Sequence, residues 1–149
     1  MGQTLLRRLG SERGTALLET AMTIPLLLLV SVAIFEFGRA FQTWEVLTNA
    51  AREGARVAVL PSSTAAVVQT RTKDYLTAGA LAGNTASVTV TPTTISIGGA
   101  NASASKVTVT YPFQFMVLQP VAKLVVKGTQ LGKPITMSAS AEMRKESPF

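Results

Sequence analysis

Residues 20–35, TAMTIPLLLLVSVAIF, form an uncharged run of sixteen residues between Glu19 and Glu36. As a helix rising about 1.5 Å per residue, the run spans roughly 24 Å, which is less than the roughly 30 Å of a bilayer's hydrocarbon core. Adding residues 15–18 completes the span but places Glu19 inside it. A lone carboxylate there is costly and usually has a partner, so Glu19 is a candidate functional residue. The alternative is that Glu19 lies at the headgroups and marks the start of the helix.

The chain contains no cysteine and no histidine. It therefore lacks thiolate ligands and disulfides, and it lacks the commonest general base and metal ligand at neutral pH. No phosphate-binding glycine loop, dinucleotide fingerprint or Gly-x-Ser-x-Gly elbow occurs. We therefore predict a protein that is not an enzyme, with no catalytic residue, metal site or cofactor. The net charge of +6 is dispersed, so nucleic-acid binding is not expected.

Basic residues before the apolar run predict its orientation. Arg7, Arg8 and Arg13 precede it, and the positive-inside tendency then keeps the N-terminus in the cytoplasm and exports the rest of the chain. A secretory signal peptide would have a small-residue cleavage site near the end of the run. The segment SVAIFEFGRA offers a poor one, because bulky Phe35 and charged Glu36 follow Ala33. We expect the helix to stay attached to the exported part.

A better small-residue site lies before the run, in SERGTALLET, where a short basic leader ends at Gly14. A chain starting at Thr15 would have Glu19 as its fifth residue. With this layout, with Ile-Pro at 24–25 and with NAAREGARVAVL at 49–60, the sequence resembles type IV pilins and pseudopilins. It is most similar to the TadE/TadG-like minor pilins of the tight-adherence (Tad, Flp-type) pilus and secretion system.

The resemblance implies that a prepilin peptidase cuts between Gly14 and Thr15 and leaves the apolar helix in place. It also implies other major and minor pilin subunits and an inner-membrane pilus assembly platform as partners. Glu19 would then face the α-amino group of Thr15 on a neighbouring subunit, because opposite charges attract strongly where the dielectric is low. Major Flp pilins commonly carry an aromatic residue at the position of Thr20, so the sequence favours a minor pilin or pseudopilin.

The second half of the helix, up to Pro61, is predicted to be amphipathic, because apolar and small residues recur at spacings of three and four. These residues are Phe37, Phe41, Trp44, Leu47, Ala51, Ala55 and Ala58. We expect this stripe to pack against the chain's own head, with contact to another subunit as the alternative. The opposite face is predicted to carry Glu36, Arg39, Glu45, Arg52, Glu53 and Arg56.

Within the charged face, Asn49, Arg52, Glu53 and Arg56 form a candidate recognition strip. Arginines one helical turn apart could jointly bind a carboxylate on a partner. The alternative is an ordinary solvated helix face.

Residues 61–149 predict a small α+β head, with a helix from Ala65 to Ala78 capped by Ser62 or Ser63. Two-residue alternation predicts an antiparallel sheet of about three to four strands, and its clearest strands run 106–114 and 135–143. Ser96–Ser105 is expected to be a hairpin loop. The apolar segment Phe115–Gly128 fits a buried strand, a short helix or a binding surface.

These inferences give a fold class of α+β in which a long N-terminal helix packs on the head. The predicted organisation is a cleaved leader (1–14), a transmembrane or filament-core half-helix (15–37), an amphipathic half-helix (38–60) and the exported head (61–149). The expected location is the bacterial inner membrane, with the N-terminus cytoplasmic and the head periplasmic or extracellular. Incorporation into a surface pilus is left open.

The predicted function is that of a structural minor pilin that helps to initiate or assemble a Tad-type pilus through helix packing and the Glu19 contact. The alternative is an unprocessed single-pass envelope protein whose head binds a ligand or partner. In that case Gly14 would be incidental.

Overall fold

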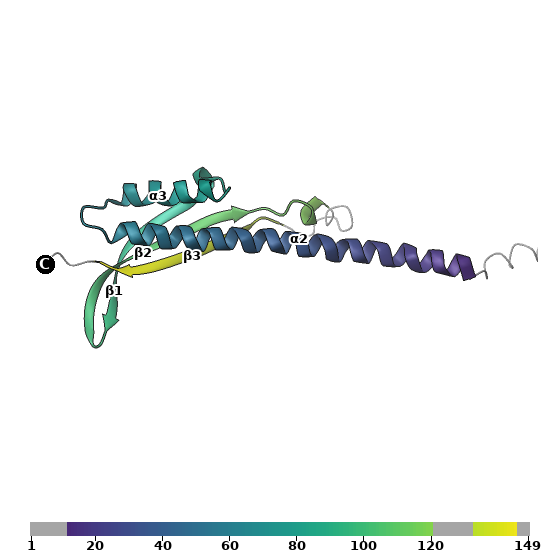
Figure 1. The fold of residues 1–149 in the computed structure, drawn as a ribbon, viewed down its shortest axis with the longest axis horizontal. Helices are drawn as coiled ribbons and strands as arrows, with labels where there is room; N and C mark the ends of the chain where they lie inside the picture. Colours follow the sequence, from purple (N-terminus) through teal and green to yellow (C-terminus); the bar gives the residue numbers. More distant parts are fainter. Residues whose placement is uncertain (1–11, 121–132, 146–149) are drawn as a thin grey trace, which may run out of the picture.

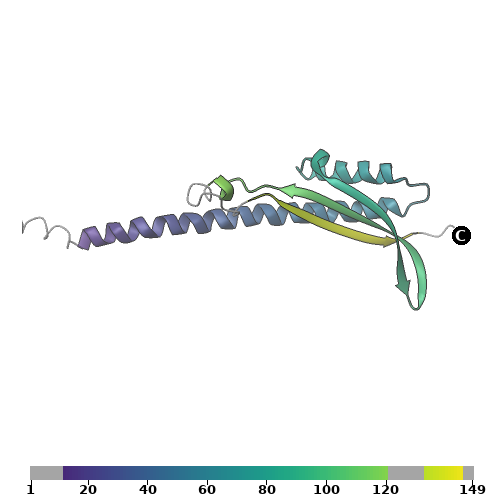
Figure 2. The same ribbon diagram turned by 180° about the vertical axis from the view of Figure 1, so that it is seen from behind.

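The helix α2 (Glu12–Ala58) runs the length of the molecule, and a small head packs against its C-terminal half (Figures 1 and 2). The computed structural model describes residues 12–120 and 133–145. In these residues α2 is followed by α3 (Ala65–Ala78), the short 3-10 helix η1 (Gly83–Thr85) and the strands β1 (Ser87–Ile97), β2 (Ala100–Phe113) and β3 (Ile135–Arg144). The predicted α+β class is confirmed.

The helix α2 forms where the sequence predicts it, since the expected bounds were near Thr15 and Leu60. It continues through Pro25, whose missing N–H costs one backbone bond without ending the helix. The helix ends at Ala58, three residues before Pro61. There the chain turns back, and Ser62 takes a left-handed φ of 64°.

The second helix has the predicted span but not the predicted cap. Thr64 is the N-cap, and its hydroxyl accepts a bond from the backbone N–H of Val67, so the expected cap at Ser62 or Ser63 is wrong. The reason is conformational: Ser62 lies in the left-handed region, whereas Thr64 is extended, as an N-cap must be. The backbone of Gly79 closes the helix at its other end.

The sheet is antiparallel in the order β1-β2-β3. Its register places Val109 opposite both Val88 and Ala139, so one face carries the small apolar side chains of all three strands. That face packs against α2, and α3 contacts both α2 and β1. Threonine and serine side chains on the other face, such as Thr89, Ser138 and Ser140, are exposed. The predicted division into an apolar and a polar face is confirmed.

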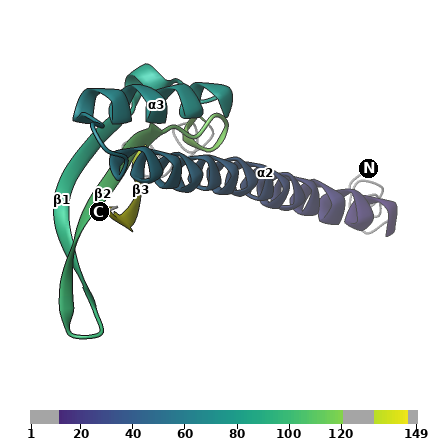
Figure 3. The same ribbon diagram turned by 60° about the vertical axis from the view of Figure 1, so that its left-hand side comes forward.

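The hairpin between β1 and β2 is longer than the sequence predicts. The expected loop Ser96–Ser105 shrinks to a turn at Gly98 and Gly99, whose positive φ values of 58° and 88° suit glycine. Residues 100–105 instead belong to β2, because pairing with β1 satisfies their backbone despite their weak strand propensity. Since β3 pairs with β2 only from Ala104 of β2 onwards, the tip of the β1–β2 hairpin projects as a two-stranded arm (Figure 3).

Small residues in α2 allow the helix to lie close to the head. The core cluster contains Leu47, Ala50, Ala51, Ala55, Val68, Leu76, Val107 and Val109. Gly54 lies where α2, α3 and β2 meet, and a Cβ there would overlap the hydroxyl of Thr72 and lie 3.0 Å from Val107 Cγ1. The absence of a side chain at residue 54 therefore sets the distance between the two helices.

The aromatic part of the predicted stripe does not pack against the head. Phe37, Phe41 and Trp44 are 74%, 50% and 46% exposed, whereas Leu47 is fully buried. The buried side of α2 instead passes through Glu36, Thr43 and Leu47, which recur at spacings of seven and four residues. The three aromatic residues lie beside that line, so the head does not reach them. The prediction of intramolecular packing is wrong for these residues.

Candidate functional site

The N-terminal half of α2 is an exposed apolar rod. The large side chains of Leu17, Met22 and Leu28 are 71%, 73% and 61% exposed in the isolated chain. The hydroxyls of Thr20, Thr23 and Ser31 donate 2.8 Å hydrogen bonds to the backbone carbonyls four residues earlier. A helix in hydrocarbon needs such internal partners for its polar groups.

Within the described residues, α2 is also the one helix long and apolar enough to cross a membrane. Length and composition fit a bilayer span, and the exposed apolar side chains need a non-aqueous partner.

The predicted cleavage and assembly residues lie together at the start of this rod. Gly14 and Thr15 are in the first turns of α2, and Glu19 follows about one turn later with an exposed side chain. A helix that began at Thr15 would carry Glu19 close to its positive N-terminal end, which favours a carboxylate. The head lies at the far end of α2, well away from these residues (Figure 1).

A second acidic site lies at the other end of the apolar run, at Glu36, which was predicted to lie on the charged face opposite the apolar stripe. Glu36 is only 2% exposed. Its Oε1 accepts hydrogen bonds from the backbone N–H of Val117 at 2.6 Å and of Leu118 at 3.4 Å. Its Oε2 is 2.8 Å from the guanidinium of Arg39. These two side chains, three residues apart on α2, therefore form an ion pair whose acid is buried.

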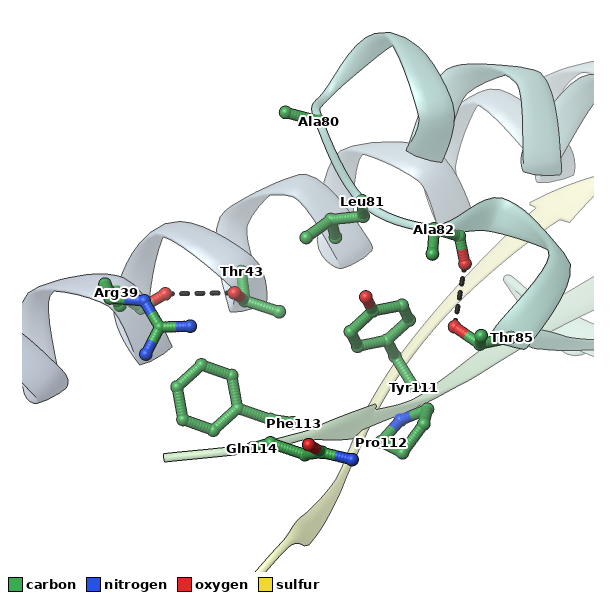
Figure 4. A pocket seen from close by; sticks show the side chains of 10 residues that line it. All are labelled: Arg39, Thr43, Ala80, Leu81, Ala82, Thr85, Tyr111, Pro112, Phe113 and Gln114. Atoms are coloured by element: carbon green, nitrogen blue, oxygen red, sulfur yellow. Dashed lines mark hydrogen bonds between the residues drawn. The ribbon is translucent and has the colours of Figure 1, made fainter. Parts of the chain in front are cut away.

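Arg39 connects this carboxylate to the end of the sheet. Its guanidinium carbon lies 5.3 Å from the centre of the Phe113 ring, within the range of a cation–π interaction. Phe113 also meets Phe115 edge-on, with ring centres 5.2 Å apart. Figure 4 shows Arg39 and Phe113 beside a pocket of about 340 Å³ between α2, the α3–β1 connection and β2. Tyr111 lines it, while the nearby threonine hydroxyls bond backbone carbonyls.

The candidate recognition strip is largely paired within the chain. Glu53 accepts two 2.9 Å bonds from Arg56 and one of 3.1 Å from Arg71 of α3. The bonds from Arg56, together with that from Arg71, lower the pKa of Glu53 to about 2 despite partial burial. Arg52 lies 3.5 Å from the amide oxygen of Asn49. The strip therefore ties α2 to α3 through Glu53, and Arg52 keeps an exposed side chain.

The described residues contain no group of three or more acidic side chains placed to hold a metal ion. The acids named above are spread along α2, from its first turns to its last. The pocket in Figure 4 has no carboxylate in its lining.

The long apolar helix with Glu19 near its start is similar to a known family. The family model for TadE-like protein matches residues 14–56. Over these residues the chain is similar to TadE-like proteins. The match covers most of α2 and ends before the head. It spans Gly14, Glu19, Glu36 and the Asn49–Arg56 strip, so it includes the predicted site residues.

The comparison with curated proteins and the comparison with solved structures gave no match. The TadE-like match supports a minor pilin-like role in the Tad pilus system, and α2 is a candidate membrane span by its length and composition.

Sequence reasoning missed the burial of Glu36. The helical spacing could have revealed it, because residues seven and four apart place Glu36, Thr43 and Leu47 on the same side of α2. The partner could not be identified in this way, since Val117 lies 81 residues further along the chain. The part of the apolar segment Phe115–Gly128 beyond residue 120 lies outside the described residues.

Proposed function

We propose that this TadE-like protein is a minor pilin or pseudopilin that helps to initiate or assemble a Tad-type pilus. A prepilin peptidase cuts between Gly14 and Thr15, the apolar half of α2 stays in the inner membrane, and the head faces the periplasm or the exterior. The observation that carries this proposal is the family match over an exposed apolar helix with a carboxylate near its start.

Glu19 is the docking charge in this proposal. In the processed chain, the α-amino group of Thr15 and the carboxylate of Glu19 have opposite charges at the same end of the helix. Within one helix the carboxylate lies beside the N-terminal end, while between neighbouring helices it can meet a second amine. A paired carboxylate avoids most of the desolvation penalty of an isolated one, so subunits in register are favoured over other arrangements.

The exposed aromatic residues of α2 support an assembly role. Phe41 and Trp44 lie with ring centres 6.2 Å apart and both are about half exposed. They continue the exposed apolar surface of residues 17–37 beyond the uncharged run. Aromatic residues left uncovered by the head are suited to helix–helix contact with another subunit, which is the alternative that the sequence analysis left open.

The test is a comparison of Glu19→Ala, Glu19→Gln and Glu45→Ala in cells that make the Tad pilus. Glu45 is an exposed acid on the same helix and serves as the control. We expect both Glu19 variants to insert in the membrane at normal levels while filament number falls at least tenfold. Glu45→Ala should leave the count unchanged. Normal filament numbers in the Glu19 variants would refute the docking role.

Processing is tested separately by intact-mass measurement of the protein from its native membrane. We expect a chain that begins at Thr15. A chain that keeps residues 1–14 while the peptidase is active would support the alternative, an unprocessed envelope protein with a partner-binding head.

A further inference from the structure

Three exposed apolar residues lie near the end of the β2–β3 ladder, where the head meets the middle of α2, and two of them adjoin Glu36. Met116, Val117 and Ile135 are 63%, 36% and 44% exposed, and we call them the boundary patch. Ile135 pairs with Phe113 at the end of the β2–β3 ladder, so it lies where the chain leaves the sheet towards Met116. The hydrogen bond from Val117 to Glu36 fixes this segment to the helix.

The patch lies at the level where the apolar rod ends. Glu36 is the first charged residue after the uncharged run 20–35. In Figures 1 and 2 the segment after β2 lies alongside α2 at the junction between its bare half and its head-covered half. If the bare half spans a bilayer, this junction lies at the lipid headgroups.

The interactions of Glu36 suit that position. A carboxylate at the edge of the hydrocarbon region is costly unless it is paired and hydrogen-bonded. The chain supplies Arg39 and two backbone N–H groups as partners and covers the carboxylate, leaving it 2% exposed. The segment that covers the carboxylate exposes the side chains of Met116 and Val117. The surface over Glu36 is therefore apolar rather than acidic.

The charge next to the patch is positive. Lys133 is exposed and lies two residues before Ile135. A lysine next to an apolar patch suits the anionic headgroups of a phospholipid surface.

We propose that the boundary patch rests in the headgroup region of the leaflet on the head side, so that the protein contacts the membrane through its head as well as through α2. This inference rests on the membrane insertion of α2 in the proposed function. It adds that Glu36 is a positioning residue, which holds Met116 and Val117 against the lipid and fixes the tilt and rotation of the head. A phospholipid bilayer is the occupant because the patch continues the apolar surface that the bilayer already surrounds.

The absence of cysteine allows the test to use single-cysteine variants of the full chain. Met116→Cys, Leu28→Cys and Val67→Cys are each labelled with a nitroxide and reconstituted in vesicles of phosphatidylethanolamine and phosphatidylglycerol. Leu28 lies within the uncharged run, and Val67 is an exposed apolar residue of α3 that serves as the matched control. The measurement is the accessibility of each label to oxygen, which concentrates in lipid, and to a water-soluble nickel chelate.

We expect the label at residue 28 to prefer oxygen strongly, the label at residue 116 to lie at headgroup depth, and the label at residue 67 to behave as in water. A label at residue 116 that matches residue 67, while residue 28 is deep, would overturn the inference and leave membrane insertion standing. A label at residue 28 that is exposed to water would overturn both this inference and the membrane insertion of α2. Spin–spin broadening at residue 116 that grows with protein density would mean that a second copy covers the patch, and this too overturns the inference.

The role of Glu36 is tested in the labelled Met116→Cys chain with Glu36→Ala and with Glu45→Ala as the control. We expect Glu36→Ala to make the label more mobile and to shift its accessibility at least threefold towards the nickel chelate. The Glu45 variant should retain headgroup depth. If Glu36→Ala leaves the depth unchanged, Glu36 does not position the patch. The labelled Glu36→Gln chain is the control for misfolding, because its amide oxygen can still accept the hydrogen bond from Val117. We expect its label to lie at a depth between those of the wild-type and Glu36→Ala chains.

Discussion

Glu36 and Val117 are 81 residues apart in the sequence, and the carboxylate of the first accepts a 2.6 Å hydrogen bond from the backbone N–H of the second. This contact joins the end of the apolar run to the segment that follows the central strand. Because Arg39 binds the other oxygen of the carboxylate and faces Phe113, the same small cluster also fixes the end of β2 to α2. The head is thus attached to the helix at the end of the uncharged run 20–35.

The contact predicts a loss of stability in Glu36→Ala. Removing the carboxylate leaves two backbone N–H groups and Arg39 without their partner, and a hydrogen bond to a charged group contributes about 2 kcal/mol. We expect the free energy of unfolding of the head, measured by denaturant titration in detergent, to fall by about 2–3 kcal/mol. The exposed Glu45→Ala variant should change it by less than about 0.5 kcal/mol. Equal values for both variants would contradict the structural role.

Gly54 predicts a second stability effect. In Gly54→Ala the added methyl overlaps the hydroxyl of Thr72, so α2 and α3 must separate. We expect a destabilisation of about 1–3 kcal/mol, typical of overpacking. Removing the hydroxyl with Thr72→Ala should recover part of this loss in the double variant, because the two changes act on the same contact. Strict additivity in the double-mutant cycle would show that the overlap is not the cause.

The Glu53 cluster predicts a pH dependence. The pKa of Glu53 is about 2 in the folded protein, because Arg56 and then Arg71 hydrogen-bond its carboxylate, and its ordinary value is 4.5. A lowered folded pKa contributes stability that is fully present above about pH 4.5 and is lost as the pH falls towards 2.

We expect the stability difference between the wild type and Glu53→Gln to be constant near neutral pH and to shrink across that acidic window. Denaturant titrations of both proteins at several pH values measure it. Taking the difference removes the contribution of the other acids, which titrate alike in both. A difference that grows on acidification would have the wrong sign for this cluster.

The exposed aromatic residues predict a separation of folding from assembly. Because Trp44 and Phe41 contribute little to the head, Trp44→Ser and Phe41→Ser should change its unfolding free energy by less than about 1 kcal/mol. If these side chains contact another subunit, both variants should lower filament number severalfold. Leu47→Ala is the matched contrast, since this buried residue should cost about 2–4 kcal/mol. A large loss of stability in Trp44→Ser would place the residue in the core instead.

The amino-acid sequence was sufficient to predict the long helix, the second helix and the alternating strands. Each depends on local signals: an apolar run without charges, a three- and four-residue spacing up to Pro61, and Val–Thr alternation near Val107 and Val109. It also indicated the similarity to TadE-like proteins, because the residues around Gly14, Glu19 and the Asn49–Arg56 strip lie within one continuous segment. The errors in the helix cap and the hairpin were local. Ser62 takes a left-handed φ that an N-cap does not have, and pairing with β1 overrode the weak strand propensity of residues 100–105.

Which side of α2 faces the head depends on tertiary contacts. A helix with apolar residues over a wide arc can bury either the aromatic line through Phe41 and Trp44 or the line through Thr43 and Leu47. The sheet reaches only one of them. The same choice placed Glu36 inside the protein, because Val117 comes from a distant segment whose N–H groups offset the cost of burying the carboxylate. Local periodicity predicts that a helix has an apolar face. Which segment covers that face depends on how distant parts of the chain pack against the helix.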